Sequence, residues 1–287
     1  MAKGRELKGR IKSIENTRKI TRTLEMVATS KMKRAQDRVQ AARPYAQSLA
    51  EVIAGLYSPD LAEKFPILRQ PAKVSRAGVI LLTSNRGLAG GFNSNLIKEG
   101  RKLLAKLDHD GVETELHVVG KKGLGYFKYI GRKVASSRID ITDRPTAQNA
   151  AEIVDDLLNR FVTRELDAVY VVHSKFVSAL STPPTSTQVL PVIPPDTKGA
   201  RPDYLLFPSA EAILSELLPL YVRNAVYRGL VENEAAFQSS QRNAMKNATD
   251  NAGEILNILR RTYNRARQAQ ITQEIAEIVG GSAALEG

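Results

Sequence analysis

The chain has no cysteine, no tryptophan and only three histidines among its 287 residues. The absence of cysteine excludes disulfide bonds, thiolate metal sites and thiol catalysis. His109, His117 and His173 are scattered, with no companion ligands at metal-binding spacing, so the sequence predicts no metal site. No apolar stretch approaches the ~18 to 20 residues that a membrane-spanning helix needs, so we expect no transmembrane span.

Positive charge is what the chain has in excess. Lys and Arg number 42 against 30 Asp and Glu, which gives a formal net charge of +12. Residues 1–43 hold 13 basic and 4 acidic residues, a net +9, so the other 244 residues carry only +3. This distribution predicts that the N-terminal segment has a partner of opposite sign, which could be an acidic protein face, a nucleic acid or an anionic membrane surface.

Small and apolar side chains recur at steps of three and four residues at both ends of the chain. One such stripe runs from Leu7 to Leu56, and the other from Leu214 through Ile255 to Ile278. This period indicates amphipathic helices, and the narrow, Ala-rich N-terminal stripe suits close packing of two helices. A helix of roughly 50 residues spans ~75 Å and needs a partner along its length. We therefore predict that the two ends pair as a long antiparallel coiled coil.

Local signals set the expected ends of the C-terminal helix. Ser209 is a predicted N-cap, with Glu211 favourably placed in the first turn. Pro219 is expected to kink or restart the helix, and Gly280-Gly281 to end it. The stretch QSSQRN at 238–243 interrupts the apolar stripe with polar residues. Two interpretations of this stretch stay open, a register-setting defect and a surface that contacts a partner.

Between the two helical ends the pattern changes to alternating strands and helices. Strands are predicted at 76–84, 113–120, 133–139 and 167–176, and amphipathic helices at 95–107 and 150–162. This alternation predicts a mostly parallel sheet covered by helices. The fold class is α/β, mainly helical, and the expected domains are the N-terminal helix 1–58, a linker 59–74, an α/β domain with a Pro-rich return 75–208, and the C-terminal helix 209–287.

The segment SNRGLAGGFN follows the first predicted strand, where glycines could let backbone N–H groups approach a phosphate. It is not G-x-G-x-x-G, and the chain has no G-x-x-x-x-G-K-[ST]. Gly123 and Gly125 also fall short of either motif. A tight structural turn is therefore favoured over a nucleotide site, although a Rossmann-type nucleotide enzyme is one hypothesis to test. Asp155 and Asp156 fit a solvated helix face, and we predict no catalytic residue and no cofactor.

A basic coiled-coil protein that binds RNA is the alternative interpretation of the +9 segment. Lys and Arg could also merely solvate a long exposed helix, but acids are too few there for i, i+4 pairing to account for the excess. A basic helical arm can lie along the phosphates of RNA. Residues 1–43 contain no aromatic side chain on which a base could stack, which argues against RNA recognition.

Four segments carry a resemblance to a known family: IKSIENTRKITRTLEMVATSKMKRAQ (11–36), LLTSNRGLAGGFN (81–93), MKNATDNAGEIL (245–256) and YNRARQAQITQEIAEIVGG (263–281). Together they resemble the gamma subunit of the rotary proton-translocating F-type ATP synthase of bacterial type, in order and along the whole chain. The resemblance implies terminal helices in an antiparallel coiled coil with an inserted Rossmann-like α/β domain. The residue periodicity independently predicts a helical hairpin with an α/β insertion.

The resemblance also implies a function, that of the central-stalk rotor. The rotor couples proton translocation through the membrane sector to ATP synthesis or hydrolysis by turning inside a hexamer of three alpha and three beta subunits. Catalytic residues would belong to beta, so this chain is expected to be a mechanical subunit without a cofactor. The implied partners are alpha, beta, the epsilon subunit and the membrane c-subunit ring, with no nucleic acid. The implied location is the cytoplasmic face of the bacterial inner membrane.

The resemblance assigns two groups of site residues. Contacts with the beta subunit are implied for Arg267, Gln268, Thr272, Glu274, Arg86, Lys31, Lys33 and Arg242. An apolar tip that turns in the hexamer is implied for Ile271, Ile275 and Ile278. An apolar bearing makes few directional bonds, so it should resist rotation weakly.

The chain departs from the family pattern at several positions. Many relatives have an acid and a cysteine where this chain has Asn85 and Ala89, and Leu24 replaces a common Met, a change that roughly conserves volume. Leu206-Phe207-Pro208 stands where Phe-Glu-Pro is common, which removes one polar group from the expected contact with the membrane ring. The sequence shows neither a transit peptide nor a Cys-containing insertion of the chloroplast type, which indicates a bacterial source.

Overall fold

The computed structural model describes residues 2–57, 64–193, 207 and 209–285. Some positions discussed above lie outside the described residues. They are Leu206 and Pro208, where the chain departs from the expected Phe-Glu-Pro, and residues 59–63 of the predicted linker. The elements are α1 (Ala2–Leu56), the 3-10 helix η1 (Pro66–Leu68), β1 (Arg76–Leu82), α3 (Phe92–His109), β2 (Glu113–Val119), α4 (Lys121–Tyr129), β3 (Ser136–Arg138), α5 (Ala147–Val162), β4 (Ala168–Ser174), β5 (Pro184–Leu190) and α6 (Ala210–Leu285).

The chain divides into two compact units. We call Met1–Ala28 with Arg242–Gly287 the helical unit, and Thr29–Gln241 the sheet unit. The sheet has the strand order β3-β2-β1-β4-β5, and only β5 runs antiparallel to its neighbour. The predicted mostly parallel sheet, inserted between N- and C-terminal helices, is therefore confirmed. Sequence reasoning missed β5, which lies in the segment interpreted as a Pro-rich return, and α4, whose glycines suggested only a turn.

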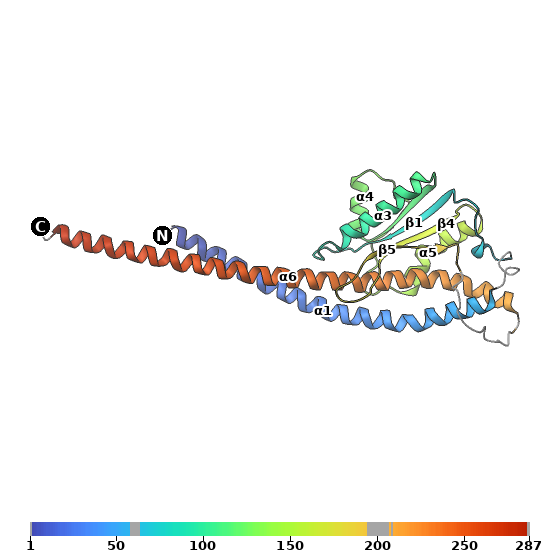
Figure 1. Cartoon of the computed structure of the whole chain (residues 1–287), viewed down its shortest axis with the longest axis horizontal. Helices are drawn as coiled ribbons and strands as arrows, with labels where there is room; N and C mark the ends of the chain where they lie inside the picture. The colour runs from blue at the N-terminus through green and yellow to red at the C-terminus, as the bar shows by residue number, and fades with distance from the viewer. Residues whose placement is uncertain (1, 58–63, 194–206, 208, 286–287) are drawn as a thin grey trace. The chain divides into compact units, whose positions relative to one another are not determined.

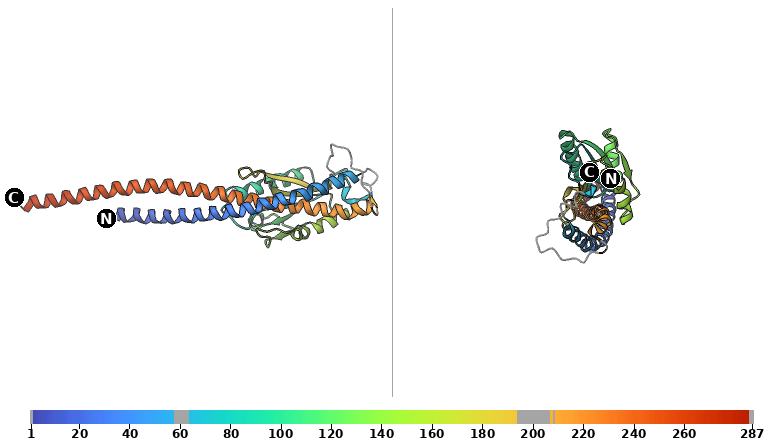
Figure 2. Two further views of the ribbon diagram at one scale, coloured as in Figure 1. Left: turned by 90° about the horizontal axis from the view of Figure 1, so that it is seen from below. Right: turned by 90° about the vertical axis from the view of Figure 1, so that its right-hand side faces the viewer.

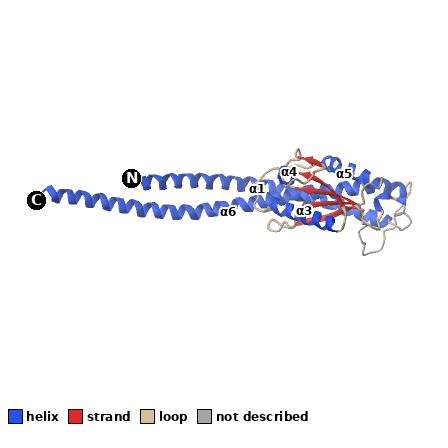
Figure 3. Cartoon of the chain, turned by 90° about the horizontal axis from the view of Figure 1, so that it is seen from above, coloured by secondary structure: helices blue, strands red, loops and turns tan. Residues whose placement is uncertain are grey.

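The sheet is buried on both faces, which explains the continuous apolar run of β1. Ala77, Val79 and Leu81 belong to one apolar cluster with α3 and Phe127 of α4. Ile80 and Leu82 belong to a second cluster with α5 and with parts of α1 and α6. Figure 1 shows α3 and α4 above the strands and α6 below them, and Figure 3 shows the strands, in red, enclosed by helices. The sheet unit is thus a three-layer α/β structure.

The part of α6 in the sheet unit buries one face that repeats every four residues. This face comprises Leu214, Leu218, Val222, Val226 and Leu230, each at most 5% exposed. It packs in one cluster with the second half of α1, from Leu49 to Leu56, while the earlier residues Ala35 and Val39 cluster with the later α6 segment 231–237. Residues earlier in α1 therefore pack against residues later in α6, as antiparallel pairing requires.

The helical unit shows the same pairing. The hydroxyl of Thr249 donates to that of Thr21 over 2.9 Å, and Arg260 is hydrogen-bonded to Glu15. In Figures 1 and 2 the first turns of α1 lie beside α6, and the N-terminal end of α1 and the C-terminal end of α6 lie at the same end of the helical pair. The antiparallel pair predicted from the two stripes is therefore confirmed in each unit.

The structure differs from three details of the predicted C-terminal helix. The face buried in the helical unit contains Leu256, which is 2% exposed, whereas Ile255 of the predicted stripe is 44% exposed. Pro219 lies inside α6 and does not restart it, because neighbouring core residues offset the lost backbone hydrogen bond. Gly280-Gly281 does not end the helix, which continues to Leu285, since glycine costs only about 1 kcal/mol in a helix interior.

The predicted N-cap is confirmed, because the hydroxyl of Ser209 accepts a hydrogen bond from the backbone N–H of Ala212 at 3.2 Å. The first two residues of the polar stretch 238–243 are buried. Gln238 and Ser239 are each 1% exposed. The Ser239 hydroxyl donates to the carbonyl of Ala179, so this part of the stretch forms polar contacts inside the sheet unit.

Substitutions at neighbouring positions separate the observed stripe from the predicted one. We expect Leu256→Ala to destabilise the helical unit by about 2–5 kcal/mol, because it removes a buried side chain and leaves a cavity. Ile255→Ala should cost less than about 1 kcal/mol, since half-exposed apolar groups contribute little. Thermal unfolding followed by helical circular dichroism measures both, and equal losses would contradict the observed pairing.

Candidate functional site

Two of the predicted contact residues meet in the sheet unit at the carboxylate of Asp143. The amine of Lys31 is hydrogen-bonded to Asp143 Oδ2, and Arg86 Nη1 lies 3.7 Å from the same oxygen. Arg38 Nη1 donates to the backbone carbonyl of Asp143 over 2.8 Å. Three basic side chains from α1 and the loop after β1 therefore share one acidic residue, which lies on the loop between β3 and α5.

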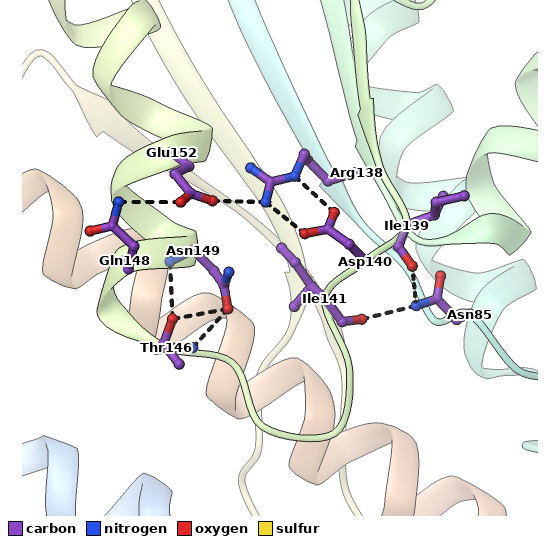
Figure 4. A network of polar contacts seen from close by, with 9 residues as sticks. All are labelled: Asn85, Arg138, Ile139, Asp140, Ile141, Thr146, Gln148, Asn149 and Glu152. Carbon is purple, nitrogen blue, oxygen red and sulfur yellow. Dashed lines mark hydrogen bonds and ion pairs between the residues drawn. The ribbon is translucent and has the colours of Figure 1, made fainter.

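This loop, residues 139–146, is held at both ends by polar contacts (Figure 4). Arg138 donates to both carboxylate oxygens of Asp140, over 2.8 and 2.7 Å, and to Glu152 over 2.8 Å. The Arg138 hydrogen bonds hold the pKa of Asp140 at about 2, well below its usual range. At the other end, Thr146 and Asn149 form a reciprocal capping box at the start of α5.

Asn85 holds the first part of this loop through hydrogen bonds to its backbone. Its amide nitrogen donates to the carbonyls of Ile139 and Ile141 over 3.0 and 2.9 Å (Figure 4). Its amide oxygen accepts from the backbone N–H of Lys121 over 3.0 Å. An ionised carboxylate could accept the last bond but could not donate the first two. Asn85 therefore ties the loop that carries Asp143 to the start of α4.

Two acids in this region have opposite electrostatic environments. Burial would raise the pKa of Asp143, but the hydrogen bond from Lys31 and the charges of Lys31 and Arg86 outweigh it, so the pKa lies below its usual value. Burial raises the pKa of Glu234 to about 7, and repulsion by Asp143 adds to this effect. Gln238 Nε2 donates to Glu234 Oε1 over 2.7 Å. One acid therefore neutralises basic side chains, and the other binds a proton near neutral pH.

The carboxyl edge of the sheet is where a doubly wound fold binds nucleotides. The cavity there has a volume of about 80 Å³ and is lined by residues after β1 and β3 and by Glu234 and Phe237 of α6. Ligand pockets are typically about 300–1,000 Å³. The turn also satisfies its own polar groups, because Ser84 N donates to Asn93 Oδ1 over 3.0 Å and Ser84 Oγ to the Arg86 carbonyl over 2.6 Å. The geometry supports the structural turn over a nucleotide site.

The remaining predicted contacts are mostly exposed. Lys33 in the sheet unit forms an i, i+4 ion pair with Asp37 at 3.1 Å, with most of its side chain exposed. In the helical unit, Arg242 is half-buried and its Nη1 donates to Asn243 Oδ1 over 3.5 Å. The other contact residues of this unit are all exposed, namely Arg267, Gln268, Thr272 and Glu274.

The predicted apolar tip lies in the same part of α6. Ile271, Ile275 and Ile278 are between 46% and 72% exposed, and Val279 beside them is 62% exposed. Gln270 Nε2 donates to Glu274 Oε1 over 2.8 Å, so contacts within the helix order the polar face. The isolated chain thus leaves an apolar strip in water at the end of a long helix.

Sequence reasoning missed Asp143 and Glu234, the two acids of the sheet unit described above. Asp143 lies 112 residues from Lys31 along the chain, so no local spacing indicates their ion pair. Glu234 is half-buried and precedes the buried Ala235 and Ala236, and this position beside a small-residue helix face is a signal that could have indicated it. Within the described ranges, no helix has the length and hydropathy of a membrane span, and no group of three or more His, Cys, Asp or Glu could hold a metal ion.

The raised pKa of Glu234 predicts a pH dependence of stability. Between its ordinary pKa of 4.5 and the folded value of about 7, the folded chain holds a proton that the unfolded chain has released. The free energy of unfolding should therefore fall as the pH rises through this window, by about 3 kcal/mol from this group. Glu234→Gln should remove this slope and make the chain more stable above pH 7.

Urea unfolding of the sheet unit at pH 5 and pH 8 measures the effect. Glu216→Gln, which changes an exposed glutamate of the same helix, is the matched control and should leave the slope unchanged. Parallel stability profiles for the parent chain and Glu234→Gln would contradict the assigned burial of a protonated acid.

Known proteins resemble this chain along its whole length. The family described as ATP synthase matches residues 3–285. The ATP synthase gamma chain of Gemmatimonas aurantiaca is 63% identical over 290 residues, covering 100% of both chains. The ATP synthase gamma chain of Psychrobacter cryohalolentis is 42% identical over 295 residues, covering 99% of this chain and 100% of its own.

Two solved structures share the fold. A chain in the rotor of the Euglena gracilis mitochondrial ATP synthase aligns with a TM-score of 0.65 at 19% identity, covering 94% of this chain and 99% of its own. A chain in the central stalk and c-ring of the Tetrahymena thermophila mitochondrial enzyme aligns with a TM-score of 0.61 at 24% identity, covering 80% and 99%. With the full-length family match and the 63% identical relative, the chain belongs to the ATP synthase gamma chain family.

Proposed function

We propose that this chain is the central-stalk rotor of a bacterial F-type ATP synthase. Proton flow through the membrane sector turns it inside a hexamer of three alpha and three beta subunits. The observation that carries the proposal is the exposed apolar strip of Ile271, Ile275 and Ile278 on a long paired helix. An apolar strip of this kind marks an interaction surface, and a surface without directional bonds suits a partner that it must slide against.

The chain acts on the beta subunits by shifting populations and carries out no chemistry itself. An asymmetric shaft contacts three beta conformers differently, so each orientation stabilises a different distribution of nucleotide-binding states. Arg267, Gln268, Thr272 and Glu274 would supply polar contacts from the exposed face of α6. Lys31, Lys33 and Arg86 would present basic charge to an acidic beta surface. Two of them, Lys31 and Arg86, are held in place by ion pairs with Asp143.

The same proposal assigns partners, location and domains. Below the hexamer the chain would contact the epsilon subunit and the membrane c-subunit ring, as a peripheral subunit on the cytoplasmic face of the inner membrane. The four segments 1–58, 59–74, 75–208 and 209–287 would then be shaft, linker, foot and shaft. The aligned Euglena and Tetrahymena chains come from rotor and central-stalk structures, and this likeness in fold supports the assignment.

Reconstitution tests the function directly. Alpha and beta subunits mixed with the full-length chain should regain coupled ATPase activity and bind one copy of it per hexamer. Failure to restore that activity would reject the rotor proposal. Salt-sensitive binding of RNA in preference to the subunits would favour the RNA-binding alternative, and nucleotide bound stoichiometrically to the isolated chain would favour the nucleotide enzyme.

Removal of residues 271–287 tests the role of the apolar tip. Every side chain that the structure describes from 271 to 281 is exposed, so among the described side chains truncation removes no core contact. We expect the truncated chain to keep the thermal stability of its sheet unit and to lose torque or assembly strength. Circular dichroism and reconstituted ATPase activity measure the two effects, and complete unfolding would contradict the bearing role.

Two neighbouring arginines test the polar contact. Arg267 and Arg265 are both exposed on α6, but a separation of two residues places them on opposite sides of the helix. Arg267→Gln should lower coupled ATPase activity about tenfold, since a charge-assisted contact contributes roughly 1.5–3 kcal/mol. Arg265→Gln, with the same change of charge, should leave the activity within about twofold of the parent chain. Equal effects of the two changes would show that only net charge matters.

A further inference from the structure

A second surface of the sheet unit has the composition of a small-molecule site and plays no part in the function proposed above. A groove of about 490 Å³ lies between α3 and α4. Its volume falls within the range of about 300–1,000 Å³ that is typical of ligand pockets. Apolar side chains line part of it, including Leu104, Phe127 and Ile130, the last of which is 46% exposed.

The α3 side of the groove is basic. Lys98, Arg101, Lys102 and Ala105 follow one another at steps of three, one and three residues, which places them on a single helix face. All four are exposed. The small and apolar residues Ala105 and Leu104 of α3 therefore line the groove together with three positively charged residues of the same helix.

These charges lack acidic partners within the chain. In the part of the chain that the structure describes, Lys98 and Lys102 have neither an ion pair nor a hydrogen bond from their side chains. Arg101 Nη1 donates to the neutral hydroxyl of Tyr126 over 3.1 Å. The groove therefore presents positive charge that the described residues leave unpaired with an acid.

The acid that lines the groove is already engaged. Asp108 accepts hydrogen bonds from Arg132 Nη1 and Nη2 over 3.0 and 3.4 Å, and another from Thr114 over 3.1 Å. The hydrogen bond from Arg132 holds the pKa of Asp108 below its usual value. Asp108 thus compensates Arg132 and leaves Lys98, Arg101 and Lys102 available.

We propose that the groove between α3 and α4 binds an amphipathic anion, an alkyl or aryl chain that carries a phosphate or carboxylate group. The apolar chain would lie on Ala105 and Ile130, over the buried side chains of Leu104 and Phe127, where it leaves water. The anionic group would accept charge-assisted hydrogen bonds from Lys98 and Lys102, with Arg101 beside them. A ligand with only the apolar chain or only the anionic group would make only one of these two interactions.

Calorimetric titration of the full-length chain with octyl phosphate, kept below its micelle concentration, tests the proposal. We expect one site per chain. Inorganic phosphate and octanol should each bind at least about tenfold more weakly, because each lacks one of the two interactions. Equal binding of inorganic phosphate, or no saturable binding of octyl phosphate, would overturn the proposal.

Paired variants distinguish the groove from general positive charge. The double change Lys98→Gln and Lys102→Gln should weaken octyl phosphate binding at least about tenfold. Lys106→Gln with Lys128→Gln removes the same charge from exposed positions outside the groove and should alter binding less than about twofold. Ala105→Phe should block the apolar part while leaving the circular dichroism spectrum unchanged. Equal weakening by both lysine pairs would overturn the proposal.

Vesicles identify the source of the anion. Binding to vesicles that contain phosphatidate over neutral vesicles, lost in the Lys98–Lys102 variant, would support the groove and assign it to a lipid headgroup. Binding of soluble octyl phosphate without vesicle binding would support the groove and assign it to a free anion. Vesicle binding that both lysine pairs reduce equally would reject the groove in favour of a diffuse basic surface.

Discussion

The antiparallel packing of α1 against α6 is the interaction on which the rest of the structure depends. In the sheet unit, α6 buries a side chain every four residues from Leu214 to Leu230 against the second half of α1 and the sheet. At roughly 1.5–3 kcal/mol for each fully buried aliphatic side chain, this one face supplies a large share of the hydrophobic stabilisation. The same helix carries Gln238 and Ser239 into the interior and leaves Glu234 half-buried, so its register also sets the polar contacts at the carboxyl edge of the sheet.

Those polar contacts close the carboxyl edge of the sheet. A doubly wound sheet usually leaves a crevice at its carboxyl edge for a ligand. Here Glu234 and Phe237 of α6 line a cavity of only about 80 Å³, and the loop that carries Asp143 is clamped by Asn85. The edge at which such a fold commonly binds nucleotides is thereby filled by side chains of the sheet unit itself.

Much of this architecture could be predicted because its signals are local. The stripes at the two ends and the run of apolar residues in β1 reflect burial that repeats with the helical or strand period. Strand β5 was missed because PTSTQVL begins with proline and is mostly polar, and it joins the sheet through pairing with β4, which is a long-range effect. The choice of Leu256 over Ile255 depends on how α6 is rotated, and adjacent apolar residues do not reveal that rotation.

The site was predictable only where the family motifs carry it. The exposed positions Arg267 and Ile271 lie in a segment whose sequence resembles the family closely, and their exposure agrees with a surface role. The ion pairs of Lys31 and Arg86 with Asp143 depend on residues brought together from distant parts of the chain. Part of the basic excess of residues 1–43 is therefore used within the sheet unit, where Lys31 and Arg38 bind Asp143.

The most direct measurement of the central claim is rotation of the chain itself. Because the chain has no cysteine, a single Gly125→Cys change on the exposed surface of α4, where a side chain meets no other atom within 4 Å, provides a unique site for a bead. With the alpha and beta hexamer fixed to a surface, ATP hydrolysis should turn the bead in one direction in discrete steps. Full hydrolysis with a bead that stays fixed or fluctuates without direction would contradict the account.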